Sequence, residues 1–78
     1  MNVYDSLREG SMQGGPYGSL SLEMLTLVDQ YKAGMLASEE FEFLIREITE
    51  VRAAQELASD EQNCRMIVAI GRTILSAV

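Results

Sequence analysis

Residues 64–78 read CRMIVAIGRTILSAV and are the most apolar part of the chain, with charged side chains only at Arg65 and Arg72. At about 100° per residue, the aliphatic side chains of this segment cover roughly 200° of a helical wheel. Because one neighbouring helix covers a narrower stripe, we expect this helix to pack against several helices, some of them from another chain. The interface residues predicted from this arc are Ile67, Ile70, Ile74 and Val78.

Two amphipathic helices are predicted before this segment. Apolar residues repeat at helical spacing over residues 20–31 and again over residues 41–51. Gly34 ends the first of these helices, since glycine tolerates the left-handed conformation that commonly follows a helix. Ser38, followed by two glutamates, begins the second helix.

A capping box, Ser59-Asp60-Glu61-Gln62, predicts the start of a third helix. No glycine or proline lies between residues 35 and 70, so the second and third helices could also form one long rod. The sequence predicts an all-α fold, in which a helix-turn-helix hairpin precedes a third, apolar helix. The helices are expected over about residues 20–33, 39–58 and 60–77.

Residues 1–18 are predicted to form a flexible, extended arm outside the helical domain of residues 19–78. The segment MQGGPYG, residues 12–18, holds three of the six glycines and the only proline, a combination that ends helices. We expect such an arm to become ordered only by lying on a neighbouring molecule. The arm residues expected to make these contacts are Val3, Tyr4, Leu7 and Tyr17.

Leu22, Leu25 and Phe43 lie off the apolar stripes of their helices. Each is roughly 100° or more from the centre of its stripe on the helical wheel. Together with the wide apolar arc of residues 64–78, they indicate a second hydrophobic surface, which commonly marks an interface. Internal packing of the third helix across the hairpin is the alternative.

The net charge is −6, from 6 Lys and Arg against 12 Asp and Glu residues. Residues 37–58 carry six glutamates and only two arginines. Because basic residues form no cluster, we expect no direct contact with nucleic acid or with an anionic membrane surface. Three opposite-charge pairs at i,i+4 spacing predict solvated helix faces: Glu42–Arg46, Arg52–Glu56 and Glu61–Arg65.

Residues suited to catalysis or metal binding are scarce. Cys64 is the only cysteine, which excludes an internal disulfide, and the lack of histidine removes the usual zinc sites. We expect Cys64 to be a small buried residue. Residues 29–40 have the outline of an EF-hand calcium loop but lack oxygen ligands at Tyr31, Ala33 and Ala37. We therefore predict no enzyme activity, no cofactor and no small-molecule substrate.

The amino terminus has no basic start followed by an apolar run, so no secretory signal peptide is predicted. The apolar stretch of residues 64–78 is shorter than the roughly 20 residues that span a bilayer. We therefore expect no membrane span.

Part of the chain resembles a known helical hairpin. Residues 27–48 fit the pattern Leu-x-x-x-Tyr-x-x-Gly-x-Leu-x-Ser-Glu-Glu-Phe-x-x-Leu-x-x-x-Ile. Over about residues 20–48, the sequence resembles the SHOCT family, a short C-terminal domain of bacterial and phage proteins. The resemblance implies a non-enzymatic hairpin that mediates oligomerisation. The family hairpin usually ends its protein and is often rich in lysine, whereas here the second helix is acidic and more chain follows Ile48.

These features favour a structural or assembly protein, a small helical subunit or adaptor in a larger oligomer, as in tailed-phage virions. Its expected partners are copies of itself or other protein subunits, and its expected location is a virion or the host cytoplasm. The alternative is a small acidic inhibitor or regulator that binds a single host protein. The number of copies in the complex distinguishes the two.

Overall fold

The computed structural model describes residues 2–77, and its regular structure in that range is entirely helical. The all-α prediction is therefore confirmed. In chain order the elements are α1 (Val3–Ser11), α2 (Gly15–Lys32), α3 (Ser38–Glu47), the π-helical turn η1 (Ile48–Arg52), α4 (Ala53–Glu56) and α5 (Glu61–Ser76).

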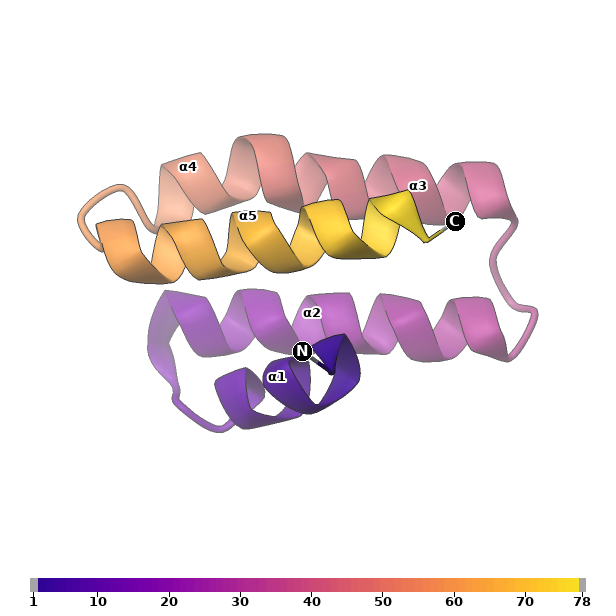
Figure 1. The fold of residues 1–78 in the computed structure, drawn as a ribbon, viewed down its shortest axis with the longest axis horizontal. Helices are drawn as coiled ribbons and strands as arrows, with labels where there is room; N and C mark the ends of the chain where they lie inside the picture. The colour runs from indigo at the N-terminus through magenta and orange to yellow at the C-terminus, as the bar shows by residue number, and fades with distance from the viewer. Residues whose placement is uncertain (1, 78) are drawn as a thin grey trace.

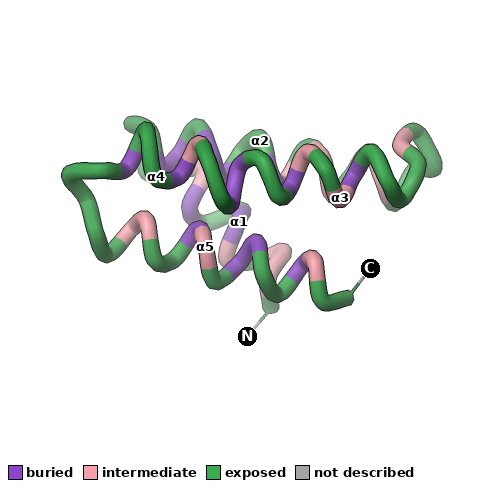
Figure 2. The backbone as a smooth tube through the Cα atoms, turned by 90° about the horizontal axis from the view of Figure 1, so that it is seen from above, coloured by how far each residue is buried: buried purple, intermediate pink, exposed green. Residues whose placement is uncertain are grey.

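Three long rods lie side by side, and the short α1 folds back against α2 (Figure 1). The rods are α2, the continuous helix α3–η1–α4 and α5, each antiparallel to the one before it. Buried positions recur along every rod between exposed ones (Figure 2), and the buried apolar residues of α1, α2, the rod and α5 form one cluster. The core thus lies between the rods, as expected for amphipathic helices in a small bundle.

The turn between α2 and α3 has the glycine stop that the sequence predicts. Gly34 has a φ of 76°, in the left-handed region. The N–H of Met35 donates to the carbonyl of Gln30 at 2.9 Å, and the N–H of Gly34 donates to the carbonyl of Tyr31 at 3.1 Å. These bonds satisfy carbonyls that the end of α2 would otherwise leave unpaired.

The chain also turns between α4 and α5, so the alternative of one long rod over the last two predicted helices is wrong. The residue that caps α5 is Asp60, one position after the predicted Ser59. Its Oδ1 accepts from the N–H of Asn63 at 3.2 Å, while Asn63 Nδ2 donates to Asp60 Oδ2 at 2.8 Å. Asp60 therefore takes the N-cap position predicted for Ser59, but the box is not closed, because Asn63 bonds the side chain of Asp60 while the N–H of Asp60 donates to the carbonyl of Leu57.

The prediction of an extended arm over residues 1–18 is wrong, because residues 3–11 form α1 and α2 already begins at Gly15. Asn2 caps α1, accepting from the N–H of Tyr4 at 3.0 Å. The glycine-rich segment is a tight turn, in which Gly14 and Gly15 both have positive φ values. Pro16 stands in the first turn of α2, where its missing N–H costs nothing.

The predicted arm contacts are made within the chain. Leu7 is completely buried, Tyr17 is buried, and Val3 and Tyr4 are half-buried. Leu7, Val3 and Tyr4 share a hollow with Ile74 near the end of α5. Helix α1 is therefore part of the core of this chain, and it is not an arm that lies on a neighbouring molecule.

The predicted interface on the C-terminal helix is likewise part of the core. Ile67, Ile70 and Ile74 of α5 are all buried within the single chain. Helix α5 touches α1, α2 and the α3–η1–α4 rod, and these neighbours together bury the centre of its apolar arc, while Met66 at its edge stays exposed. Val78, the fourth predicted residue, lies outside the described residues.

One close contact fixes the packing of α5 on the rod. A Cβ atom built on Gly71 would lie 1.9 Å from Oγ1 of Thr49, so no side chain fits there without movement. Thr49 is buried in the π-helical turn, and its hydroxyl donates to the carbonyl of Ile45 at 2.8 Å. In this turn the N–H of Ala53 donates to the carbonyl of Ile48, five residues back.

Candidate functional site

A groove of about 420 Å³ separates α2 from the α3–η1 part of the rod. We call it the α2–α3 groove. The residues that line it are Leu22, Glu23, Thr26, Leu27 and Gln30 from α2, and Leu44, Glu47, Ile48 and Arg52 from the rod. Its aliphatic lining residues are Leu22, Leu27, Leu44 and Ile48, and its charged side chains are two glutamates and one arginine.

Two of the three off-stripe residues predicted from the sequence are exposed, one in this groove and one in a neighbouring hollow. Leu22, which lines the groove, is 53% exposed, and Phe43 is 65% exposed. Phe43 lines an adjacent hollow with Glu39, Glu40 and Leu44. The two hollows share Leu44 as a lining residue, and we call them together the groove surface.

Leu25, the third residue predicted to lie on this interface, does not belong to the groove surface. It is half-buried and packs against the core. Its distance from the stripe of α2 is explained by the number of helices around α2, which touches α1, α3 and α5. A helix with three neighbours buries more than one stripe. For Leu25, the alternative of internal packing is therefore correct.

Arg52 joins the two walls of the α2–α3 groove. Its Nη1 lies 2.6 Å from Oε2 of Glu23 on α2, and its Nε lies 2.9 Å from Oε2 of Glu56 one turn along the rod. Hydrogen bonds to Glu23 and then to Glu56 raise the pKa of Arg52 above its ordinary value. The guanidinium charge is thus already balanced by two carboxylates of the same chain.

The groove surface carries a negative charge. Four glutamates and one arginine line the groove and its adjacent hollow, for a net charge of −3. No salt bridge forms among residues 2–77 for Glu39, Glu40 or Glu47. The groove surface therefore combines aliphatic side chains with carboxylates that are free to interact with a cation.

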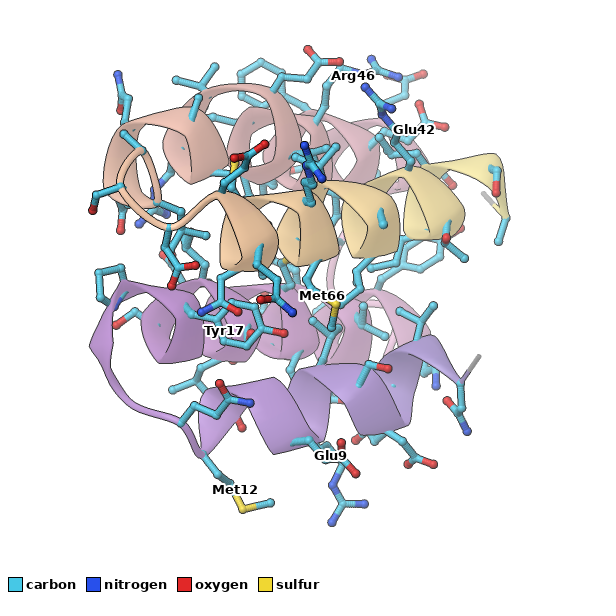
Figure 3. All side chains as sticks on the ribbon, turned by 60° about the vertical axis from the view of Figure 1, so that its left-hand side comes forward. Glu9, Met12, Tyr17, Glu42, Arg46 and Met66 are labelled. Carbon is cyan, nitrogen blue, oxygen red and sulfur yellow. The ribbon has the colours of Figure 1, made fainter. Side chains whose placement is uncertain are left out.

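The predicted charge pairs are confirmed in part. Arg52–Glu56 and Glu61–Arg65 form as expected from their spacing. Arg46 pairs with Glu50, at 3.9 Å, instead of with Glu42. Figure 3 labels Glu42 and Arg46, which project from the rod at the solvent-facing side of the molecule.

The rest of the described surface offers little chemistry. Cys64 is half-buried, and its Sγ lies 3.6 Å from the carbonyl of Ala53. Residues 2–77 contain no cluster of three or more side chains that could bind a metal ion. Met12, in the turn after α1, and Met66, on α5, are exposed far apart in the chain (Figure 3), as single apolar residues often are. Within the same range, none of the helices has both the length and the apolar character needed to cross a bilayer.

Sequence reasoning missed the contacts that shape the groove. The Glu23–Arg52 pair joins residues far apart in the chain, and no local spacing indicates it. The approach of Gly71 to Thr49 has a faint signal, a lone glycine inside an apolar helix. Leu22 and Phe43 had a usable signal in their off-stripe positions.

Comparison of the chain with protein-family models, curated proteins and solved structures finds no match. The resemblance to the SHOCT hairpin therefore stays a prediction, and the site is judged by its geometry alone.

Proposed function

We propose that this protein is a non-enzymatic structural or assembly protein, a small helical subunit or adaptor that binds another protein through the groove surface. The observation that supports this proposal is the exposure of Leu22 and Phe43 beside an aliphatic groove. Exposed apolar side chains beside an apolar groove cost free energy in water and commonly mark a binding surface.

Two further features support binding over catalysis. The ionisable groups at the groove surface are glutamates and one arginine, and that arginine is held between two carboxylates. No nucleophile with an adjacent base lies in the groove. The same groups are well suited to the charged rim of a protein interface.

The alternative function is a small acidic inhibitor or regulator that binds a single host protein. The negative charge of the groove surface supports this alternative function. Carboxylates beside aliphatic side chains select a partner protein by charge as well as by shape. Both functions use the same surface and differ in the number of copies in the complex. As part of the same proposal, the protein is located in a tailed-phage virion or in the host cytoplasm.

Native mass spectrometry of the full-length tagged chain, purified gently from its source cells, tests the proposal. We expect masses above that of one chain, with repeated copies for an assembly subunit and one chain plus one host protein for a regulator. The double substitution Leu22→Ser/Phe43→Ser should return the chain to the mass of a monomer. Both side chains are exposed, so the fold should survive.

The matched control is Met12→Ser/Met35→Ser, which removes two exposed apolar side chains that do not line the groove surface. This control should keep the complex. A wild-type chain that is monomeric in the source extract would contradict the proposal. So would a complex that the Leu22→Ser/Phe43→Ser variant retains.

A further inference from the structure

We infer that the segment bound by the groove surface is a basic amphipathic helix of a partner protein, with lysines or arginines beside its apolar stripe. This inference rests on the proposed function and names the chemistry of the partner. It is argued from the secondary structure, the charge and the composition of the groove surface.

The walls of the groove favour a helix over an extended strand. Both walls are helices, whose backbone N–H and C=O groups are paired within the helix. A strand added to a sheet needs an exposed edge of unpaired backbone groups, and residues 2–77 contain no sheet. An amphipathic helix needs only an apolar groove, into which side chains at i, i+3, i+4 and i+7 insert.

The length of the groove fits about two turns of a bound helix. On α2 the lining residues extend from Leu22 to Gln30, which at 1.5 Å per residue is about 12 Å. The aliphatic side chains within this span are Leu22, Leu27, Leu44 and Ile48. Phe43 lengthens the apolar surface past the end of the groove.

The charge of the groove surface favours a basic partner. Arg52 is balanced by Glu23 and Glu56, so it offers little to an incoming carboxylate. The charged side chains of the groove surface that form no salt bridge are Glu39, Glu40 and Glu47. An acidic helix would meet repulsion there, whereas lysines or arginines would meet three carboxylates.

A second copy of this chain fits the groove surface less well. The chain has a net charge of −6, so two copies repel each other. Its own cations are largely engaged: Arg65 pairs with Glu61, and Lys32 lies 4.8 Å from the centre of the Tyr4 ring. No described helix of the chain therefore presents a cluster of free cations beside an apolar stripe.

Binding of two synthetic helical peptides to the full chain tests the inference. Both peptides have about 14 residues with leucines at i, i+3, i+4 and i+7, flanked by lysines in one and by glutamates in the other. Fluorescence anisotropy at low salt should show the lysine peptide binding at least about tenfold more tightly than the glutamate peptide. Raising the salt concentration should weaken the binding of the lysine peptide more than that of the glutamate peptide.

Two pairs of variants locate the binding. The triple substitution Glu39→Gln/Glu40→Gln/Glu47→Gln should lower the affinity of the chain for the lysine peptide about tenfold. Asp5→Asn/Glu9→Gln/Glu61→Gln also removes three negative charges, but none from the groove surface, and should weaken it much less. Leu22→Ser should abolish binding of the lysine peptide, whereas Met12→Ser should not.

Three results would overturn the inference: no binding of the lysine peptide, equal binding of the two peptides, or an equal effect of the two triple variants. Equal binding that Leu22→Ser abolishes would refute the basic partner and leave the proposed function standing. The proposed function is refuted only by the native mass spectrometry of the chain purified from its source cells, and that experiment uses no peptide. The two failures are therefore distinguishable.

Discussion

Replacing Gly71 with alanine should destabilise the fold, although alanine is the better helix former. The new methyl carbon would lie 1.9 Å from Oγ1 of Thr49 and 2.9 Å from its Cβ. To relieve this clash α5 has to move away from the rod, and Thr49 has to rotate and lose its bond to the carbonyl of Ile45. Overpacking of this kind and the loss of one buried hydrogen bond cost about 2–4 kcal/mol.

The gain in helix propensity from glycine to alanine offsets about 1 kcal/mol of this cost. The net loss is about 1–3 kcal/mol, and each kcal/mol lowers the Tm of a chain of this size by about 4–8 °C. Thermal unfolding followed by circular dichroism measures the change. Thr49→Ala removes both Oγ1 and Cγ2, so Gly71→Ala should cost about 1 kcal/mol less in that background.

Gly18→Ala is the matched control, because it is also a buried helical glycine. A Cβ there would lie 3.6 Å from the nearest atoms, which is ordinary contact. The control should raise stability by about 0.5–1 kcal/mol through helix propensity alone. A Gly71→Ala variant that melts at or above the wild-type temperature would refute the close contact between α5 and Thr49.

Two further predictions test other parts of the fold by thermal melting. Leu7→Ala should cost about 2–5 kcal/mol because Leu7 is completely buried, and an unchanged Tm would show that α1 does not belong to the core. Gly34→Val should cost about 1–2 kcal/mol more than Gly34→Asn, since nothing lies within 4 Å of a Cβ at this positive φ and only the backbone conformation resists the change. Equal melting of the two Gly34 variants would contradict the left-handed stop of α2.

Local signals in the sequence determined the three long helical rods and the two turns between them, but not α1 or the start of α2. The stop at Gly34 and the start of α5 near residue 60 depend on neighbouring residues only, through a positive φ and a side-chain cap. The off-stripe positions of Leu22 and Phe43 likewise predicted that these side chains would be exposed. Periodicity and capping act within a few residues, and sequence shows them directly.

Tertiary structure decided which apolar surfaces remain free, and the two main errors in the sequence prediction have one cause. The glycines and proline of residues 12–18 are compatible with a loose arm or with a tight turn, and only the burial of Leu7 selects the turn. The apolar arc of α5 was assigned in part to another chain because periodicity within a helix does not show how many helices of the same chain surround it. In the fold α5 touches α2, the α3–η1–α4 rod and α1, and these neighbours bury Ile67, Ile70 and Ile74. Contacts between elements far apart in the chain decided both points, and no local pattern of residues shows such contacts.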